Sequence, residues 1–400
     1  MKIDTDPKKI EDFLTRGVEN VYPNKEFVKN LLLSGKKITM YLGMDPTAPT
    51  LHIGNFVPVM KLKEFQDLGH QVILLIGDFT ATIGDPDKLS VRKPLTRRQV
   101  LNNCKLYKKQ LSTLIKFGFS GAKLVYNSKW LGKMNFEDVL NLASKMTVDQ
   151  MLKRDMFQER IKQGRPVYIH EFMYPLMQGY DSVVLKVDGE IGGNDQTFNM
   201  LTGRDLMKEM VNKEKFVLTT KLLVDNSGVK MGKTMGNMAS ITDTASDMFG
   251  KVMSWTDGMI LGGFELCTFV PIDEIEKIKQ EMAGGVNPRD VKVRLAKEIV
   301  AIYHSKKEAD KAEGNFVNTF KDGGLPEKID EVVATNGEAL SELSVKAGLV
   351  KSKGEFRRLV LENAVSNQET GDKITDPNWK VISTAIFKIG KRRFLKVIVK

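Results

Sequence analysis

Apolar residues in the first part of the chain alternate between short continuous runs and stretches of helical spacing. Residues 37–42 form a β-like run that ends at Gly43, and residues 55–68 carry apolar side chains at helical intervals. Residues 72–76 are apolar without a break, which is typical of a strand buried on both faces of a parallel sheet. Strand, turn, helix and strand in this order predict a βαβ unit.

The same alternation continues through the following residues. Further β-like runs at residues 123–126 and 182–187 are separated by helical stretches. We therefore predict an α/β fold with a Rossmann-like, doubly wound parallel sheet over residues 1–242.

Amphipathic helical patterns dominate the next region, residues 243–330. One pattern covers residues 272–282 and another covers residues 291–303. Before the second of these, Asn287 predicts a helix cap and Pro288 a first helical turn.

A linker and a small terminal region follow. Residues 322–337 are punctuated by Gly and Pro and predict the linker. After it come helical segments at 340–349 and 354–363 and β-like segments at 380–389 and 393–399, which predict a small α+β region. The three predicted domains are residues 1–242, 243–330 and 338–400.

Length and composition set the broad class of protein. A chain of 400 residues is long for one hydrophobic core, and 42% hydrophobic with 28% charged residues is ordinary for a soluble globular protein. The sequence has no apolar run of about 18 residues, so we expect no membrane span, and its first residues lack the apolar segment of a signal peptide. Cys104 and Cys267 show no metal-type spacing, so we expect no metal site and a reducing, cytoplasmic location.

The net charge of +11 is unevenly distributed. Residues 338–400 hold 13 Lys and Arg against 7 Asp and Glu, which is more than half of the excess. A general solubility role would not concentrate charge in one terminal region. We therefore expect a polyanionic partner there, such as nucleic acid.

The segment GMDPTAPTLHIGN at residues 43–55 places hydrogen-bond donors beside glycine where a helix is predicted to begin. A helix N-terminus offers free N–H groups and the positive end of its dipole to phosphate. Gly54 would let a nucleotide approach the backbone, while His52 and Asn55 can donate hydrogen bonds. Taken alone, such a short motif is more often an ordinary capped helix.

A second polar, glycine-rich segment, VDNSGVKMGKTMGN at residues 224–237, carries two lysines. A Walker A loop is the obvious alternative, but only three residues separate Gly228 from Gly232, whereas that loop requires four. The spacing therefore excludes it. Lys230 and Lys233 remain candidate phosphate ligands.

A third pattern predicts a pocket for a small zwitterion. Tyr174, Gln178 and Asp181 fall on one face of a predicted helix. Because the flanking side chains are apolar, we expect this polar face to line a cavity rather than to meet solvent. With Asp85 and Gln196 it would offer acceptors for an ammonium group and a donor for a carboxylate.

Together these motifs resemble class I aminoacyl-tRNA synthetases, in particular the tyrosyl enzymes, over nearly the whole chain. DPTAPTLHIGN resembles the family's signature region, with Asn55 where a second His is usual. KMGKT resembles a variant of its lysine loop (226–237), and Tyr-x₃-Gln-x₂-Asp followed by Gly-Gly-x-Asp-Gln resembles its tyrosine pocket. GLVKSKGEFRRLVLENAVSN resembles an S4-type RNA-binding module, with an altered loop at residues 365–371.

The resemblance implies a ligase that forms tyrosyl-adenylate and pyrophosphate from tyrosine and ATP. It would then transfer tyrosine to the 3′ end of tRNA(Tyr). Mg²⁺ would arrive with ATP, region 243–330 would bind the anticodon, and the chain would form a cytoplasmic homodimer.

The resemblance also assigns roles to residues. The ATP side would include Gly43, Asp45, Thr47, His52, Gly54 and Asn55, with Gly193 and Asp195 at the ribose. Lys230, Met231, Lys233 and Thr234 would close on the pyrophosphate. Tyr41 and Asp181 would bind the substrate phenol, Tyr174, Gln178 and Asp85 its ammonium group, and Gln196 its carboxylate. Lys351, Lys353, Arg357 and Arg358 would meet RNA phosphates.

Two alternatives stay open at this point. A tryptophan-type ligase would be built similarly, although the pair Tyr41 and Asp181 suits a phenol better than an indole N–H. A non-catalytic RNA-binding protein could keep the fold, although two intact nucleotide motifs argue against it. Whether Lys88 and Arg92 reach pyrophosphate is also left open.

Overall fold

The computed structural model describes residues 2–85, 94–119, 121–224, 238–320, 329–390 and 393–400. The chain divides into two compact units, Met1–Asp310 and Lys311–Lys400.

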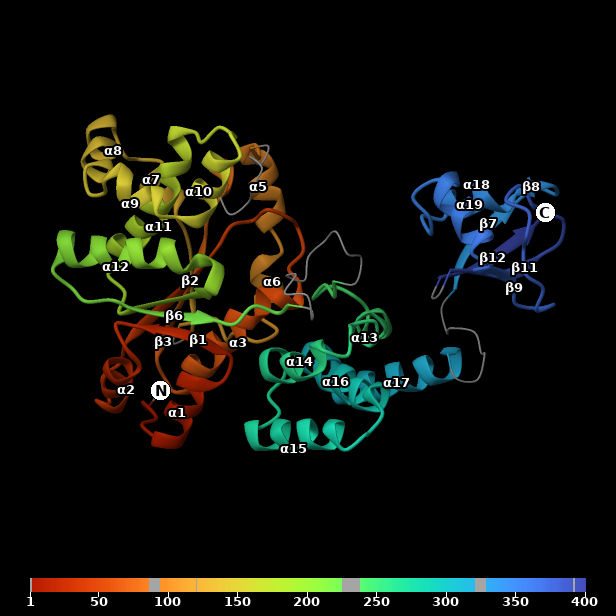
Figure 1. The fold of residues 1–400 in the computed structure, drawn as a ribbon, viewed down its shortest axis with the longest axis horizontal. Coiled ribbons are helices and arrows are strands. Elements are labelled where there is room, and N and C mark those ends of the chain that lie inside the picture. Colours follow the sequence, from red (N-terminus) through yellow and green to blue (C-terminus); the bar gives the residue numbers. More distant parts are fainter. Residues whose placement is uncertain (1, 86–93, 120, 225–237, 321–328, 391–392) are drawn as a thin grey trace. The chain divides into compact units, whose positions relative to one another are not determined.

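The described part of the first unit is built on a six-stranded sheet in the order β1-β6-β5-β2-β3-β4 (Figure 1). The strands are β1 (Val18–Tyr22), β2 (Thr39–Met44), β3 (Gln71–Ile76), β4 (Lys123–Tyr126), β5 (Gly189–Gly193) and β6 (Phe216–Thr220). Strands β2 to β6 run parallel, whereas β1 pairs antiparallel with β6 at the edge. The predicted doubly wound α/β fold is confirmed, with this antiparallel edge strand added to it.

The predicted βαβ unit consists of β2, α3 (Ile53–Asp67) and β3. Leu42 of β2 pairs with Leu74 of β3, and both side chains are buried. Helix α3 covers one face of the sheet and buries its apolar side chains, among them Phe56 and Phe65, against it. The opposite face is covered by α11 (Ile169–Leu185) and α12 (Thr197–Val211) (Figure 1).

Helices α11 and α12 approach each other closely at two glycines. A Cβ atom added to Gly179 would lie 3.2 Å from the Cα of Gly203 and 2.7 Å from Cδ1 of Leu206. No side chain fits between the two backbones here, so glycine at 179 sets the distance between the helices.

One predicted strand is wrong. Residues 182–187 were expected to be β-structure from their apolar run, but α11 continues to Leu185, and Lys186 ends it in a left-handed conformation with φ of 50°. Ser182 is fully buried on the helix face, so tertiary packing overrides the β preference of the adjacent valines. The strand that follows, β5, is rich in glycine and therefore has no β-like pattern.

The other elements in the described part of the first unit are helices. Its other helices are α1 (Pro7–Thr15), α2 (Lys25–Leu33), α4 (Thr80–Ile83), α5 (Arg97–Cys104), α6 (Tyr107–Leu111), α7 (Ser128–Leu131), α8 (Phe136–Ala143), α9 (Val148–Leu152), α10 (Asp155–Lys162), α13 (Ala245–Met253), α14 (Met259–Cys267), α15 (Ile272–Ala283) and α16 (Pro288–Tyr303), with the short 3₁₀ helix η1 (Asn194–Gln196). As predicted, Asn287 caps α16, and its side chain accepts a hydrogen bond from the N–H of Arg289 at 3.0 Å.

These later helices belong to the same compact unit as the sheet. Arg16, at the end of α1, donates to the carbonyl groups of Phe264 (2.9 Å), Glu265 (3.0 Å) and Thr268 (2.6 Å) at the end of α14. Phe56 of α3 packs edge-on against Tyr303 of α16, with ring centroids 5.5 Å apart. The division near residue 242 stays a prediction, because the structure draws its unit boundary at Asp310 instead.

Helix α17 (Lys306–Phe320) leads into the second unit, which is a small α+β fold. Strands β7 (Asp330–Ala334), β12 (Arg393–Val399), β11 (Ala385–Ile389) and β9 (Val365–Asn367) form one sheet, and β8 (Glu338–Ala339) pairs with β10 (Lys380–Val381). Helices α18 (Leu340–Lys346) and α19 (Lys353–Leu361) match the predicted helical segments, and Phe356 and Phe387 lie in a shared apolar core.

Candidate active site

A cavity of about 840 Å³ opens beside the carboxyl ends of β2 and β5. The strand order reverses between these neighbours, and ligands of doubly wound sheets bind at such a reversal. All the described residues assigned above to ATP and to the amino acid line this cavity except Tyr41. They are Gly43, Asp45, Thr47, His52, Gly54, Asn55, Asp85, Tyr174, Gln178, Asp181, Gly193, Asp195 and Gln196.

The front motif forms a reciprocal cap at the start of α3. Nδ1 of His52 accepts a hydrogen bond from the N–H of Asn55 at 3.3 Å, and Oδ1 of Asn55 accepts one from the N–H of His52 at 3.1 Å. Because Nδ1 is an acceptor, the neutral imidazole carries its proton on Nε2. The amide oxygen of Asn55 is likewise used by the backbone, so its NH₂ group is the part that can serve a ligand.

The loop between β2 and α3 is held by side chains that the sequence analysis did not single out. Asn103 donates to the carbonyl of Pro46 at 2.9 Å, and Tyr107 donates to that of Ala48 at 2.7 Å. Gln110 accepts from the N–H of Leu51 at 2.8 Å. These contacts fix the backbone of the motif before any ligand arrives.

Asp45 joins three elements at the cavity wall. Its carboxylate accepts from the hydroxyl of Thr80 at 2.7 Å and from the phenol of Tyr174 at 2.8 Å. Gly77 lies so close that an added Cβ would come 2.0 Å from Oδ1 of Asp45. Burial, reinforced by the charge of Asp45, raises the pKa of Tyr174 well above its usual value, so its hydroxyl stays a donor.

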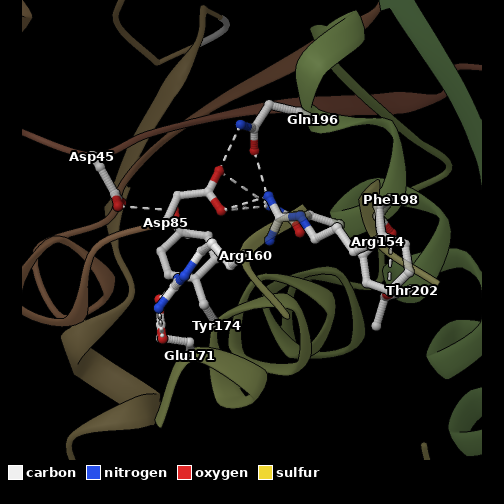
Figure 2. A network of polar contacts seen from close by, with 10 residues as sticks. Asp45, Asp85, Arg154, Arg160, Glu171, Tyr174, Gln196, Phe198 and Thr202 are labelled. Atoms are coloured by element: carbon white, nitrogen blue, oxygen red, sulfur yellow. Dashed lines mark hydrogen bonds and ion pairs between the residues drawn. The ribbon is translucent and has the colours of Figure 1, made fainter. Parts of the chain in front are cut away.

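Asp85 is the centre of a second polar cluster, and it also lines the cavity (Figure 2). Its carboxylate accepts from Nε2 of Gln196 at 2.7 Å and pairs with Arg154 at 2.8 Å. Arg154 is buried between the rings of Phe157 and Phe198, and neither the arginine nor these rings were foreseen. Asp85 therefore has a compensating cation of its own.

The ion pair of Arg160 with Glu171 fixes the start of α11, the helix that carries the polar face (Figure 2). Two hydrogen bonds of 2.6 and 2.9 Å join the guanidinium to the carboxylate. Glu171 also accepts from the N–H of Tyr168 at 2.8 Å.

Asp181 lies at the deep end of the polar face and is 2% exposed. Nε1 of Trp130 donates to it at 2.7 Å, and Nδ2 of Asn127 donates at 3.3 Å. Burial raises the pKa of Asp181 well above its usual value, while these two donors oppose the shift. Trp130 and Asn127 were not predicted, since they follow β4 far from any recognised motif.

Tyr41 is fully buried and lies outside the set of cavity-lining residues. Its hydroxyl is 3.0 Å from Oγ of Ser182 and 3.4 Å from the carbonyl oxygen of Gln178. Burial, together with nearby Glu190, raises its pKa well above the usual value. The expected direct contact of Tyr41 with a substrate phenol therefore stays a prediction.

A buried ion pair, also unforeseen, stands behind Gln178. Nε2 of Gln178 donates to Oε1 of Glu190 at 3.0 Å, and Nζ of Lys215 pairs with the other oxygen of the same carboxylate. Burial lowers the pKa of Lys215, and the charge of Glu190 opposes that shift.

Lys230, Met231, Lys233 and Thr234, like Lys88 and Arg92, lie outside the described residues. Before residues 225–237, Leu222 and Leu223 line the cavity. After them, the carbonyl of Ala239 accepts a hydrogen bond at 3.0 Å from the N–H of Ile53, which lies between the lining residues His52 and Gly54.

The four basic residues that the resemblance assigns to RNA, Lys351, Lys353, Arg357 and Arg358, are all exposed. Lys353 pairs with Glu342 at 2.6 Å, and Arg358 lies 3.8 Å from Glu362. Lys351 and Arg357 have no ion-pair partner among the described residues of this unit.

Across the described residues, no group of three or more His, Cys, Asp or Glu side chains is placed to hold a metal ion. Within the same residues, no helix is both long and apolar enough to span a membrane.

The chain is similar to known proteins over most of its length. A family model described as tRNA synthetases class I (W and Y) matches residues 33–321. The chain is 45% identical to the tyrosine–tRNA ligase of Carboxydothermus hydrogenoformans, over 100% of this chain and 99% of that one. It is 43% identical to tyrosine–tRNA ligase 2 of Vibrio cholerae, over 97% and 98% of the two chains.

Solved structures agree on the fold. A truncated mitochondrial tyrosyl-tRNA synthetase of Aspergillus nidulans superposes with a TM-score of 0.66 at 25% identity, covering 78% of this chain and 94% of that one. A tyrosyl-tRNA synthetase of Archaeoglobus fulgidus, complexed with L-tyrosine, superposes with a TM-score of 0.62 at 23% identity, covering 77% and 100% of the chains.

Proposed function

Because the chain belongs to the class I tRNA synthetases of the tryptophanyl and tyrosyl group, we propose that its cavity activates tyrosine with ATP and passes the tyrosyl group to tRNA(Tyr). The protein is an aminoacyl-tRNA ligase. The observation that carries the assignment of the site is one cavity lined by both the N-terminus of α3 and the polar face of α11. The first suits a triphosphate and the second a zwitterion with a polar ring substituent.

On the nucleotide side, the start of α3 supplies the groups that a triphosphate needs. The free N–H groups and the dipole of a helix start favour phosphate. Nε2–H of His52 and the NH₂ group of Asn55 add two side-chain donors. Gly43, Gly54 and Gly193 leave room for the nucleotide, while Asp45, Thr47 and Asp195 supply oxygen atoms for its ribose and for ordered water.

On the amino-acid side, carboxylate and amide groups match the two ends of tyrosine. Asp85, Gln178 and Tyr174 would hold the ammonium group, and Gln196 would meet the carboxylate. Asp181, with Tyr41 behind it, would meet the phenol. Phenylalanine would leave the buried Asp181 without that partner. A site built to hydrogen-bond a hydroxyl group rejects the analogue that lacks it, and the tyrosyl enzymes are themselves the known example.

The chemistry needs positioning and charge stabilisation rather than a base. The carboxylate of tyrosine is ionised at neutral pH and attacks the α-phosphorus of ATP, and pyrophosphate leaves. Donors around the phosphates stabilise the charge that grows during this step. By family likeness Lys230, Lys233 and Thr234, with the backbone at Met231, would act on the leaving pyrophosphate, and Mg²⁺ would enter with ATP.

In the second step the 3′-terminal hydroxyl of tRNA attacks the tyrosyl carbonyl, and AMP leaves. The second unit would bind this tRNA through Lys351, Lys353, Arg357 and Arg358, since exposed cations on and beside one short helix meet phosphates. The helices of region 243–330 would meet the anticodon. The first assignment follows the family likeness and the charge of the tail, and the second follows the family likeness alone.

We also infer a homodimer in the cytoplasm. Large apolar side chains are exposed on α8 to α11, where a second copy would cover them; they are Phe136, Leu140, Val148, Ile161, Tyr168 and Ile169. Its substrates are those of translation, and both cysteines are free thiols, as a reducing compartment requires.

ATP–pyrophosphate exchange tests the proposal directly. We expect exchange that depends on tyrosine and is absent with tryptophan or phenylalanine. Exchange that depends on tryptophan would point to the related ligase, and exchange with no amino acid would refute the role of the polar face. Lys233→Ala should slow exchange far more than it weakens tyrosine binding, because its role is in the transition state.

A further inference from the structure

A buried cation lies behind the wall of the amino-acid pocket, and neither substrate assignment uses it. Lys215 immediately precedes β6, and Glu190 lies in β5; their exposed fractions are 0% and 1%. Nζ of Lys215 pairs with the carboxylate of Glu190 and donates to Oγ of Ser182 at 2.9 Å and to the carbonyl of Met200 at 3.1 Å. All three hydrogens of the ammonium group are therefore used inside the protein.

Of this pair, only Glu190 reaches the cavity wall, where Gln178 is its neighbour. Oε1 of Glu190 accepts from Nε2 of Gln178 at 3.0 Å. An ionised carboxylate can only accept hydrogen bonds, so it selects the NH₂ end of the amide. The amide oxygen is then the end available to a ligand, and no described residue donates to it.

We propose that Glu190 and Lys215 are positioning residues that hold the Gln178 amide with its oxygen toward the cavity, as the acceptor that the ammonium group of the substrate requires. Neither side chain touches the reacting atoms. The inference rests on the proposed assignment of Gln178 to the ammonium group.

The ammonium group of Lys215 is the reason that the side-chain amide of Gln178 has a single orientation. A buried carboxyl group without a partner would take up a proton and could then both donate and accept. Gln178 could then turn either end toward it. In the structure Lys215 is that partner, and the ion pair leaves both oxygens of Glu190 as acceptors, so that only one orientation of the amide is hydrogen-bonded.

The same cation reaches the surroundings of Tyr41. Nζ of Lys215 donates to Oγ of Ser182 at 2.9 Å, and this oxygen lies 3.0 Å from the hydroxyl of Tyr41. The ion pair therefore contacts the side chain of Gln178 directly and that of Tyr41 through Ser182.

The test compares two ligands that differ only in the ammonium group, L-tyrosine and 3-(4-hydroxyphenyl)propanoate. Their affinities for the full-length chain are measured by calorimetry at constant pH, and the ratio is the readout. The decisive variant is Glu190→Gln with Lys215→Met, which removes both buried charges and leaves the net charge of the site unchanged. A glutamine at 190 can present either its oxygen or its NH₂ group, so the amide of Gln178 loses its enforced orientation.

We expect the preference for tyrosine to fall about tenfold in this variant, the size of one hydrogen bond to a charged group. Affinity for the propanoate should stay within about twofold, since no group that binds it has changed. An unchanged preference in a folded variant would overturn the inference. If the double variant does not fold, Glu190→Gln alone is compared in the same way, and an undiminished preference there would overturn the inference as well.

Gln178→Met separates this inference from the site assignment beneath it. If Gln178→Met keeps the full preference for tyrosine, the assignment of Gln178 to the ammonium group is wrong. If Gln178→Met loses the preference while the charge-neutral double variant keeps it, the assignment stands and only the role of Glu190 and Lys215 fails.

Discussion

The phenol of Tyr174 donates to Oδ2 of Asp45 over 2.8 Å, and this bond joins the side chain assigned to the tyrosine ammonium to one assigned to ATP. Tyr174 comes from α11, whereas Asp45 follows β2, and both side chains line the cavity. Asp45 is held in addition by Thr80 at 2.7 Å. The nucleotide side and the amino-acid side of the cavity are therefore joined by the hydrogen bond between Tyr174 and Asp45. Each substrate should influence the binding of the other.

Tyr174→Phe should weaken the binding of both substrates. The change removes the phenol donor from Oδ2 of Asp45, and the loss of a hydrogen bond to a charged group costs about 1–3 kcal/mol. In pyrophosphate exchange we expect KM to rise about tenfold for tyrosine and to rise clearly for ATP. Tyr180→Phe on the same helix is the matched control and should leave both constants near their original values. A normal KM for ATP in Tyr174→Phe would argue against coupling through Asp45.

Asn55→Asp should separate the two roles of this side chain. Aspartate keeps an oxygen that can cap α3, so the free energy of unfolding should change by less than about 1 kcal/mol. It lacks the NH₂ donor and places a negative charge beside the triphosphate, so the rate of pyrophosphate exchange should fall by about two orders of magnitude or more. Asn55→His introduces the residue that is usual at this position in the family, and this variant should retain most of the rate of pyrophosphate exchange. A fully active Asn55→Asp enzyme would show that Asn55 only caps the helix.

Gly179→Ala should destabilise the first unit. Its Cβ would lie 2.7 Å from Leu206 and 3.2 Å from Gly203, and such overpacking costs about 1–3 kcal/mol. Gly262→Ala, in α14, has no atom within 4 Å of the added Cβ and should stabilise by about 0.5–1 kcal/mol through helix propensity. Urea unfolding measures both. Equal effects of the two substitutions would contradict the close approach of α11 and α12.

His70 should make stability fall as the pH drops. Its ring is 4% exposed, Nδ1 accepts from the N–H of Ile38 at 3.5 Å, and Nε2 has no partner among the described residues. Burial lowers the pKa of His70 to about 4, below the unfolded value of 6.5, so the unfolded chain takes up the proton first. The contribution of this residue is therefore fully present above pH 6.5 and is lost as the pH falls toward about 4, with a slope of at most about 1.4 kcal/mol per pH unit.

Denaturant melts of the parent chain and of His70→Asn over this pH range isolate the effect. Asparagine can keep an acceptor near the position of Nδ1 but does not titrate. We expect the variant to lose the His70 part of the slope, and parallel pH profiles would contradict the lowered pKa.

Arg357→Ala should weaken tRNA binding without affecting tyrosine activation. Arg357 is exposed and has no ion-pair partner among the described residues, so it is available to a phosphate. We expect the slope of log affinity against log salt to become shallower by about one unit, as for the loss of one phosphate contact. Lys36→Ala, an exposed change in the first unit, is the control. An unchanged salt slope would place the RNA contact elsewhere on the chain.

The sequence predicted the parts of the site that lie in contiguous motifs. His52 and Asn55 stand three residues apart at a helix start, and Tyr174, Gln178 and Asp181 share a helix face, so local periodicity was enough to group each set. The parallel sheet followed from the apolar runs of β2 and β3. The two sets of residues meet in one cavity because of the order of the strands in the sheet. That order cannot be predicted from any local sequence pattern.

The residues that were missed act through contacts between distant segments. Trp130 reaches Asp181, and Arg154 reaches Asp85, across separations of 51 and 69 residues. A lysine just before a strand, such as Lys215, would be expected to point into solvent. Nothing in the sequence indicates that its side chain is completely buried. The misplaced strand at 182–187 has the same origin, because the burial of Ser182 depends on α12, β2 and β5 rather than on its neighbours in sequence.

The contacts of Arg16 with the end of α14 bear on how the chain can be divided for experiments. A fragment that ends at residue 242 would keep Arg16 but remove the carbonyl groups of Phe264, Glu265 and Thr268 that it binds. It would also uncover Phe56, whose ring packs on Tyr303. The shortest soluble piece that carries the cavity should therefore extend to the end of the first unit at Asp310, and expression trials of truncated chains should begin from that point.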